Sequence, residues 1–196
     1  MIVLASASPR RQELLRNAGI PFSVQPADID ERPLAGESPR ACAERLARGK
    51  ALAVFQSRPL DYVLGADTIV VVRDTILGKP RDKDDAARML RMLSGRTHEV
   101  ITGVCVAEPV AGGQWSAASN GNAPTASEST LVTMGQLSDE EIRDYVATGE
   151  PMDKAGAYAI QGMASRWIPR IEGDYSNVVG LPVALVYRVL RELGAL

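Results

Sequence analysis

The sequence predicts an α/β fold in which short apolar strands alternate with amphipathic helices. Its 196 residues correspond to one domain or to two tightly joined lobes, since domains usually hold roughly 100–200 residues. Apolar residues make up 45% and charged residues 23%, which is ordinary for a globular protein with a core. Apolar runs are repeatedly followed by residues that begin helices. Intrinsic disorder and a large multidomain assembly are therefore excluded.

The chain begins with a predicted strand over residues 2–5 that leads into a helix. Ser8 is a favourable N-cap, Pro9 suits the first helical turn, and Gly19 is placed to end the helix. A second short strand is expected at residues 22–24, and residues 28–33 read as a polar loop.

Ser38 and Pro39 repeat the pattern of an N-cap serine followed by proline, and they predict a helix to about Phe55. Its apolar stripe, spaced i, i+3, i+4 and i+7, also contains Lys50. A lysine on such a face either extends its ammonium to water or serves a function, and the pattern alone leaves both interpretations open.

Residues 62–72 form the strongest strand pattern, nearly all apolar and rich in β-branched residues, as expected of a buried central strand. Asp67 lies in its middle. A short strand at residues 76–77 and the sequence Gly78-Lys79-Pro80 follow. Asp82 then caps a helix that continues to about Leu93.

Residues 100–107 and 130–134 predict two more strands, joined by a long, mobile loop over residues 108–126 that is rich in Gly, Ser, Ala, Asn and Pro. Ser138 and Glu141 form a capping box at the start of a helix. Strand is expected at residues 167–168 and 170–171. Pro182 begins the last helix, whose expected inward residues are Val183, Val186, Tyr187, Leu190 and Leu193.

Charge, cysteine content and the length of apolar runs bear on whether the protein binds nucleic acid, carries a metal or disulfide framework, or spans a membrane. The net charge of −2 excludes a global attraction to nucleic acid or to an anionic membrane. Cys42 and Cys105 lack metal-site or disulfide spacing and are predicted to be small buried residues. The N-terminal apolar run is too short for a signal peptide, and no run reaches the roughly 18–20 residues of a membrane span. A soluble, cytoplasmic protein is expected.

The segment around the first helix has the features of an anion site. Ser6, Ser8, Arg10 and Arg11 surround a strand-to-helix turn, where unpaired N–H groups and the helix dipole favour negative charge. Two arginines add forked donors that match phosphate oxygens. A capped surface helix with solvated arginines remains the alternative.

Asp67 is the principal candidate for catalysis. A carboxylate in an apolar strand costs free energy unless it is hydrogen-bonded, paired or bound to metal. Lys50, Lys79, Arg10 and Arg11 are the candidate cations, and Lys79 lies in a short rigid frame suited to a phosphate. A structural Asp67 that bonds backbone N–H groups at a bulge remains the alternative.

Other polar residues give weaker signals. Asp30 and Glu31 could bind Mg²⁺, although a solvated acidic loop is favoured by their pattern alone. His98, the single histidine, is predicted to be a satisfied surface residue. No Gly-x-Ser-x-Gly elbow or histidine metal motif occurs, so a catalytic base is expected to be a carboxylate.

Six blocks of sequence occur in order between residues 4 and 182. They are Leu4-Ala5-Ser6-Ala7-Ser8-Pro9-Arg10-Arg11, Gly65-Ala66-Asp67-Thr68, Gly78-Lys79-Pro80, Leu93-Ser94-Gly95, residues 153–162 (DKAGAYAIQG) and residues 175–182 (YSNVVGLP). Together they resemble the Maf family of nucleoside triphosphate pyrophosphatases.

The resemblance implies an elongated, mixed and twisted sheet in two lobes with a central cleft, similar to the inosine triphosphate pyrophosphatases. It also implies hydrolysis of a nucleoside triphosphate between the α and β phosphates, with a divalent metal cation, Mg²⁺ or Mn²⁺. A homodimer is implied as well.

The resemblance assigns roles to particular residues. Asp67 becomes the general base or a metal ligand that activates water, and Glu31 helps to hold the metal. Ser8, Arg11, Lys50 and Lys79 bind phosphates. Arg10, Thr68 and Gln161 match the branch that acts on dTTP and UTP rather than on 7-methyl-GTP. The amide of Gln161 offers a donor and an acceptor that suit uracil or thymine.

Two features depart from the family pattern. Gly49 stands where glutamate is expected, which weakens the helix by up to ~1 kcal/mol and puts the setting of Lys50 in question. The loop over residues 108–126 is longer than usual in the family and has no functional interpretation.

Two other function classes compete with the enzyme. A nucleotide-binding regulator of cell division or septum formation would bind nucleotide without turnover, but a buried Asp67 facing phosphates does not help a pure binder. A protein that binds single-stranded nucleic acid would carry aromatic residues along a basic groove. Aromatic residues are only 5% of the chain and do not alternate with the basic ones, so no nucleic-acid partner is expected.

Overall fold

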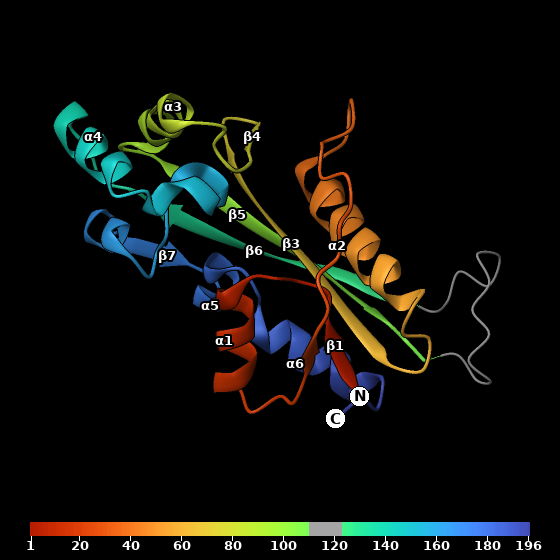
Figure 1. The fold of residues 1–196 in the computed structure, drawn as a ribbon. Helices are drawn as coiled ribbons and strands as arrows, with labels where there is room; N and C mark the ends of the chain where they lie inside the picture. The colour runs from red at the N-terminus through yellow and green to blue at the C-terminus, as the bar shows by residue number, and fades with distance from the viewer. Residues whose placement is uncertain (110–122) are drawn as a thin grey trace. The chain divides into compact units, whose positions relative to one another are not determined.

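The computed structural model describes residues 1–109 and 123–196 (Figure 1). Its strands are β1 (Ile2–Leu4), β2 (Ser23–Val24), β3 (Tyr62–Val72), β4 (Thr75–Leu77), β5 (Thr97–Ala107), β6 (Thr125–Thr133) and β7 (Arg170–Glu172). Its α-helices are α1 (Pro9–Asn17), α2 (Pro39–Phe55), α3 (Lys83–Leu93), α4 (Asp139–Ala147), α5 (Tyr175–Val179) and α6 (Val183–Glu192). The 3₁₀ helices of the described residues are η2 (Glu150–Asp153), η3 (Ala155–Ala157) and η4 (Met163–Trp167). The predicted α/β class is confirmed.

The strands form one mixed sheet in the order β2-β1-β3-β5-β6-β7, with β4 paired to β3. Strand β1 is parallel to both β2 and β3, and Val3 lies opposite Ser23 and Val63. The pairs β3–β4 and β6–β7 are antiparallel. The strand predicted over residues 62–72 is confirmed with the same bounds.

The predicted helix starts are also confirmed. In each case a side-chain oxygen accepts an N–H that would otherwise have no partner in the first turn. The caps are Ser8 for α1, Ser38 for α2, Asp82 for α3 and the Ser138–Glu141 capping box for α4. Gly19, with φ of +67°, follows the end of α1 in the left-handed conformation expected of a glycine there.

The described residues form two compact units. Unit 1 contains Met1–Asp67, Thr102–Glu128 and Gly180–Leu196, and unit 2 contains Thr68–Ile101 and Ser129–Val179. The limits of the units fall within β3, β5 and β6. The expected cleft between two lobes stays a prediction.

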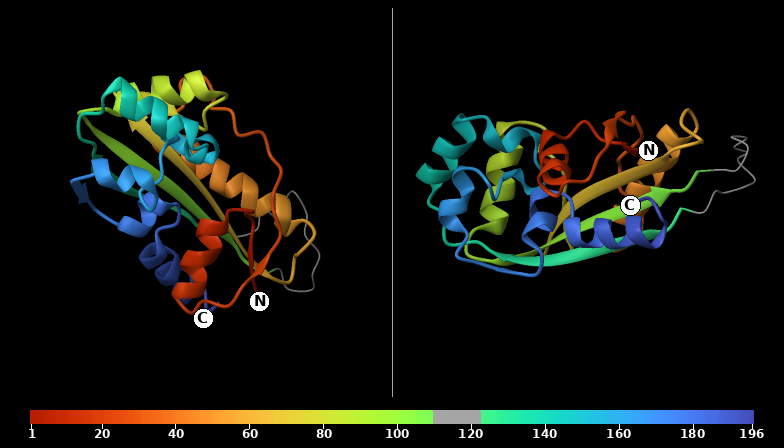
Figure 2. Two further views of the ribbon diagram at one scale, coloured as in Figure 1. Left: turned by 60° about the vertical axis from the view of Figure 1, so that its left-hand side comes forward. Right: turned by 90° about the horizontal axis from the view of Figure 1, so that it is seen from below.

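Unit 1 has a layer of helices on each face of its strands (Figure 2). Because side chains alternate along β1, Ile2 and Leu4 enter one core cluster and Val3 and Ala5 enter the other. The first cluster includes residues of α1 and α6, and the second includes residues of α2. The apolar faces of the three helices thus provide much of the burial that holds this unit together.

Unit 2 is built around α3, which packs against α4 and against η3. Its fully buried side chains include Leu77, Leu90, Leu93, Ile142 and Tyr145. The 3₁₀ helices of this unit were not predicted, because turns this short give no measurable apolar periodicity.

The strand predicted at residues 167–168 is wrong. Trp167 ends η4, its indole Nε1 donates a hydrogen bond of 3.0 Å to Glu141 Oε1, and its ring packs edge-on against Tyr145. These tertiary contacts with α4 override the local strand preference of the sequence. Strand β7 is confined to Arg170–Glu172.

The expectation that Tyr187 packs inward is also wrong, because its side chain is exposed. Helix α6 buries Leu185, Val186 and Leu190, and the next position after Val186 is turned about 100° away from that stripe. Arg191 covers Tyr187 instead and donates a hydrogen bond of 3.2 Å to its hydroxyl.

The loop predicted over residues 108–126 is shorter at its far end, because β6 already begins at Thr125. Residues 110–122 of this prediction lie outside the described part of the chain. Strand β5 starts at Thr97, three residues earlier than predicted, and α5 was not predicted at all.

Cys42 and Cys105 are buried and free, as predicted. Burial raises the pKa of the Cys42 thiol to about 11, so this group stays protonated and unreactive near neutral pH. Among the described residues, no helix combines the length and the apolar character needed to cross a bilayer.

His98 is buried, so its prediction as a surface residue is wrong. Its Nε2 lies 2.8 Å from the hydroxyl of Tyr158, and the two rings meet edge to face. Burial without a charged partner lowers the pKa of His98 to about 4.

We therefore expect the imidazole signal in a proton NMR titration to stay in its neutral position until the pH falls well below 6. Since the unfolded chain binds a proton near pH 6.5 and the folded chain does not, the free energy of unfolding should fall as the pH drops from 6.5 toward 4. A histidine that titrates near 6.5 in the folded protein would contradict the buried placement.

Candidate active site

Gly65 allows helix α2 to lie directly against strand β3. A Cβ atom at this position would overlap the carbonyl oxygen of Ala47 and approach the backbone nitrogen of Ala51 to 2.6 Å. Two residues further along the same strand, Asp67 points to the same face as Gly65. The glycine therefore brings the helix that carries Lys50 close to the carboxylate of Asp67.

Lys50 and Asp67 form a buried ion pair. Lys50 Nζ lies 2.6 Å from Asp67 Oδ1, and both residues are 8% exposed. The lysine on the apolar stripe of α2 is thus explained by a partner on β3 and does not extend to water. Of the cations considered for Asp67, Lys50 forms an ion pair with it. Asp67 lies within the 11 residues of β3.

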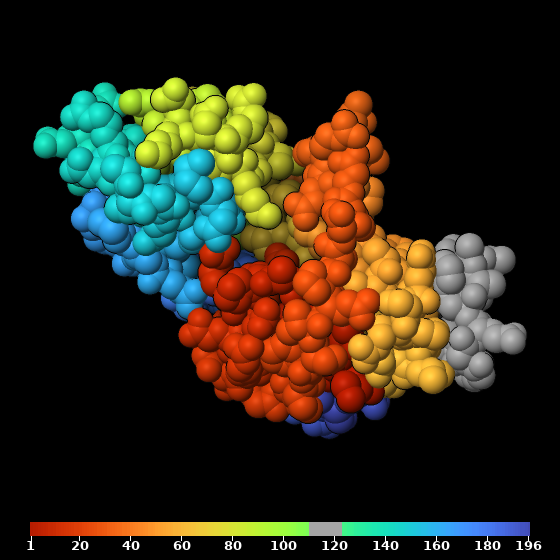
Figure 3. All heavy atoms as spheres, viewed as in Figure 1, coloured from red at the N-terminus to blue at the C-terminus, as the bar shows by residue number. Residues whose placement is uncertain are grey.

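Glu31 completes the cluster from a different part of unit 1. Its Oε1 lies 2.5 Å from Lys50 Nζ, so one ammonium bridges two carboxylates. The neighbouring Asp30 forms a different ion pair, with Arg32 at 2.6 Å. Glu31 is half exposed, and its segment between β2 and α2 forms part of the surface drawn in orange in Figure 3.

The donor set of this cluster fits a divalent cation. A single positive group already sits between the oxygens of Glu31 and Asp67, which shows that both carboxylates can turn toward one cation. Carboxylate oxygens are the ligands that Mg²⁺ prefers, with water and phosphate oxygens filling its other positions. No group of three or more His, Cys, Asp or Glu side chains within residues 1–109 and 123–196 is arranged to hold a metal. A cation here would therefore depend on water and substrate oxygens.

The start of α1 provides an ordered set of donors in the same unit. Arg11 donates from Nε to the carbonyl oxygen of Gly180 at 2.7 Å and from Nη1 to Ser6 Oγ at 3.2 Å. The N–H of Ser8 also donates to Ser6 Oγ at 3.2 Å, while Ser8 Oγ caps the helix. Ser6 and Gly180 thus hold Arg11 in one orientation.

Arg11 is electrostatically linked to the carboxylate cluster. Burial lowers the pKa of its guanidinium below the ordinary value, and the negative charges of Asp67 and Glu31 act in the opposite direction. An arginine partly removed from water has a strong preference for an anionic partner. Unit 1 therefore places a fixed guanidinium, a bridging ammonium and two carboxylates within interaction range of one another.

Gly49 is explained by its contact with the segment that carries Glu31. A Cβ atom at Gly49 would approach Ile29 Cδ1 to 3.1 Å, which is tight contact. The glycine next to Lys50 therefore leaves room for residues 29–31 to pack over α2 and bring Glu31 to the ammonium.

We expect Gly49→Ala to change the free energy of unfolding only slightly. Alanine favours the helix by ~1 kcal/mol over glycine, and the contact with Ile29 offsets part of that gain. Urea denaturation of the two proteins measures the difference. A loss of stability greater than the helix gain would show that Ile29 cannot move.

Lys79 and Gln161 belong to unit 2, where backbone contacts hold their loops together. The N–H of Gly156 donates to the carbonyl oxygen of Gly78 at 3.1 Å, and a Cβ at Gly156 would lie 3.0 Å from the methyl groups of Val70. The motif around Lys79 is thus joined to the motif of residues 153–162. Both side chains are exposed.

The loop of Gln161 is anchored by Glu150. The carboxylate of Glu150 accepts the N–H of Met163 at 3.1 Å and the hydroxyl of Tyr145 at 2.8 Å. Gly162 leaves the space that this carboxylate occupies. Sequence reasoning missed the roles of Glu150 and Tyr145, because neither belongs to a recognisable motif of the site.

The structure thus brings part of the predicted site together. Unit 1 holds Ser8, Arg10, Arg11, Glu31, Lys50 and Asp67, of which Arg10 is half-exposed. Unit 2 holds Thr68, Lys79 and Gln161, and Thr68 follows Asp67 directly in β3. The catalytic and binding roles of these residues stay predictions.

Comparison with known proteins gives the family. The sequence model described as Maf-like protein matches residues 1–193. The chain belongs to the Maf family. The match covers nearly the whole chain, including all six sequence blocks on which the resemblance rested.

Relatives of this Maf protein match it over essentially their full length. A dTTP/UTP pyrophosphatase of Koribacter versatilis is 57% identical over 196 residues, covering 100% of this chain and 95% of the relative. One of Geobacter sp. strain M21 is 53% identical, with 100% and 96% covered, and one of Geobacillus sp. strain WCH70 is 49% identical, with 98% of each chain covered.

Proposed function

We propose that this Maf protein is a hydrolase that converts dTTP and UTP to the nucleoside monophosphate and pyrophosphate. The observation that carries the proposal is the buried Asp67–Lys50–Glu31 cluster, in the family whose relatives named above are dTTP/UTP pyrophosphatases. Its cellular role would be to remove these or modified pyrimidine triphosphates from the nucleotide pool.

The arrangement of charge supports hydrolysis more than simple nucleotide binding. A protein that only binds triphosphates gains affinity from cations and loses it to carboxylates near the phosphates. Asp67 is nevertheless buried in unit 1, although removing its charge from water is unfavourable. The ion pair with Lys50 offsets part of this free energy. A carboxylate in this position can accept a proton from water that attacks a phosphorus atom, which is the role of a general base.

A divalent cation, Mg²⁺ or Mn²⁺, is part of the proposal. Glu31 and Asp67 would hold it, and water and phosphate oxygens would supply the other ligands. When bound, such an ion neutralises phosphate charge and stabilises the transition state. Lys50 would then be released from part of its pairing and free to contact a phosphate oxygen.

The remaining residues of the proposal bind the triphosphate. Arg11, fixed by Ser6 and Gly180, offers its guanidinium to a phosphate, and the N-terminus of α1 next to Ser8 favours negative charge. Lys79 is proposed to bind a phosphate as well, on the basis of its motif Gly78-Lys79-Pro80. These donors stabilise charge that develops during cleavage of the α–β bond.

Base selection is assigned to Gln161, Arg10 and Thr68. We expect Gln161→Ala and Arg10→Ala to lower kcat/KM for UTP and dTTP by about tenfold or more while leaving purine triphosphates and the metal requirement nearly unchanged, since a lost polar contact to the base costs roughly 1–2 kcal/mol. Pyrophosphate release from a panel of canonical and modified triphosphates measures this. Equal losses for pyrimidine and purine substrates would count against the assignment.

We also propose that the protein acts in the cytoplasm as a homodimer. Two buried free cysteines are consistent with a reducing compartment. Sedimentation equilibrium of the purified protein tests the dimer, and a monomer at micromolar concentration would contradict it.

A further inference from the structure

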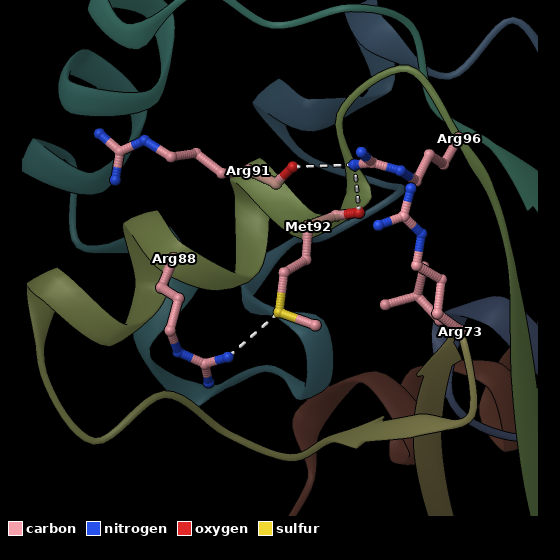
Figure 4. Close-up of a pocket in the computed structure, with 6 residues that line it drawn as sticks. Arg73, Arg88, Arg91, Met92 and Arg96 are labelled. Carbon is pink, nitrogen blue, oxygen red and sulfur yellow. Dashed lines mark hydrogen bonds between the residues drawn. The ribbon is translucent and has the colours of Figure 1, made fainter.

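Unit 2 contains a pocket lined by four arginines, outside the candidate active site. The cavity has a volume of about 310 Å³ and is lined by Val72, Arg73, Arg88, Arg91, Met92 and Arg96. Val72 ends β3, Arg73 lies in the turn between β3 and β4, and the other four residues come from α3 and the segment that follows it (Figure 4). None of the sequence motifs discussed above includes these arginines.

Two of the four guanidinium groups are paired with carboxylates. Arg88 pairs with Asp85 at 2.7 Å and donates toward the sulfur of Met92. Arg91 turns away from Met92 in Figure 4 and pairs with Asp139 at 2.8 Å. These ion pairs fix the two helical arginines and offset part of the positive charge at their end of the pocket.

Arg73 and Arg96 keep uncompensated charge. Arg96 donates from Nη1 to the carbonyl oxygens of Met92 and Arg91, at 2.8 and 3.1 Å, so its guanidinium is held at the end of α3. It has no carboxylate partner within residues 1–109 and 123–196. The guanidinium of Arg73 has no hydrogen-bond or ion-pair partner among the described residues, and it points toward Arg96 in Figure 4. The pocket therefore combines two guanidinium groups that are not paired with described carboxylates and the apolar side chains of Val72 and Met92.

The backbone at Arg73 is unusual for its residue type. Arg73 and Asp74 have φ of +48° and +61°, a conformation in which two-residue hairpin turns favour asparagine and glycine. An arginine is a poor choice for the stability of this turn. Residues held in such strained conformations concentrate at functional sites, because the strain is tolerated where the side chain is needed.

We propose that this arginine pocket binds a small phosphate monoester, with the phosphate on Arg73 and Arg96 and a compact apolar body against Val72 and Met92. Planar guanidinium groups match two phosphate oxygens at once, and charge-assisted hydrogen bonds of this kind are the strong ones. The volume lies at the lower end of ligand pockets, which favours a small molecule over a peptide. This binding is independent of the proposed pyrophosphatase reaction.

The test uses the full chain with ¹³C-methyl methionine, because Met92 reports directly on the pocket. Phenyl phosphate is titrated at constant ionic strength, with inorganic phosphate, benzyl alcohol and an acidic hexapeptide as separate arms. The Met92 signal is assigned with Met92→Leu. We expect phenyl phosphate to shift this signal to saturation at lower concentration than inorganic phosphate, and benzyl alcohol to have little effect.

Two variants separate the pocket from general electrostatics. Arg73→Asn suits the turn and keeps the hairpin folded, and it should weaken phenyl phosphate binding by about tenfold or more. Arg143→Gln removes one exposed charge on α4 that does not line the pocket, and it should change binding by less than twofold. Equal weakening by both variants, no shift of Met92, or stronger binding of the peptide would overturn the proposal.

Discussion

Asp67→Asn is expected to lower kcat for pyrophosphate release from UTP by at least about 100-fold, because a positioned general base contributes roughly that much or more. The substitution keeps the size of the side chain but removes the group that accepts a proton. Lys50 keeps its contact with Glu31, so the variant should stay folded and bind UTP nearly as the unchanged protein does. Steady-state assays with calorimetric titration of UTP measure both properties.

Asp85→Asn is the matched control for this variant. Asp85 is also a buried aspartate paired with a basic residue, Arg88, but it lies in α3 of unit 2 and outside the candidate site. It should keep kcat close to that of the unchanged protein. Unchanged turnover in Asp67→Asn, or an equal loss in both variants, would remove Asp67 as the catalytic group.

Lys50→Met is expected to reduce the free energy of unfolding by about 3 kcal/mol or more. Removing one partner of a buried ion pair leaves the other charge buried and uncompensated, in this case Asp67. Because the competing ammonium is gone and two carboxylates remain, Mg²⁺ should stabilise this variant more than it stabilises the unchanged protein. Urea denaturation with Mg²⁺ or with EDTA measures both effects.

Lys79→Met serves as the control, since Lys79 is exposed and its replacement should change stability by less than about 0.5 kcal/mol. If Lys50→Met were as stable as this control, the ion pair with Asp67 would not exist in solution. If Mg²⁺ stabilised both variants equally, the carboxylate cluster would not be its binding site.

The sequence predicted which residues of the site are unusual but could not predict how they meet. A lysine on an apolar helix stripe and an aspartate in an apolar strand each violate local patterning, and such violations concentrate at functional sites. Their contact depends on Gly65, which lets α2 approach β3, and that approach is a property of the packed structure. Glu31 was predicted only as a metal ligand. Its ion pair with Lys50 could not be predicted, because a loop sequence does not indicate which distant residue it will contact.

Contacts between distant parts of the chain account for what sequence analysis missed. The carbonyl oxygen of Gly180 holds Arg11 across 169 positions, and backbone acceptors carry no side-chain signal in a sequence. Residues 167–168 were predicted as strand from local residue types, Trp and Ile, whereas the indole of Trp167 donates a hydrogen bond to Glu141, close to the start of α4. By contrast, the helix caps at Ser8, Ser38 and Asp82 depend on residues within one turn, and all three were predicted.

The most direct test of the proposed reaction is a ³¹P NMR time course of the protein with UTP. With Mg²⁺ present, UMP and pyrophosphate are expected to appear in equal amounts, and EDTA is expected to stop their formation. Formation of UDP and orthophosphate would mean that a different bond is cleaved. Bound UTP that stays intact would contradict the assignment of Asp67 as a catalytic base and would indicate a protein that senses nucleotides without hydrolysing them.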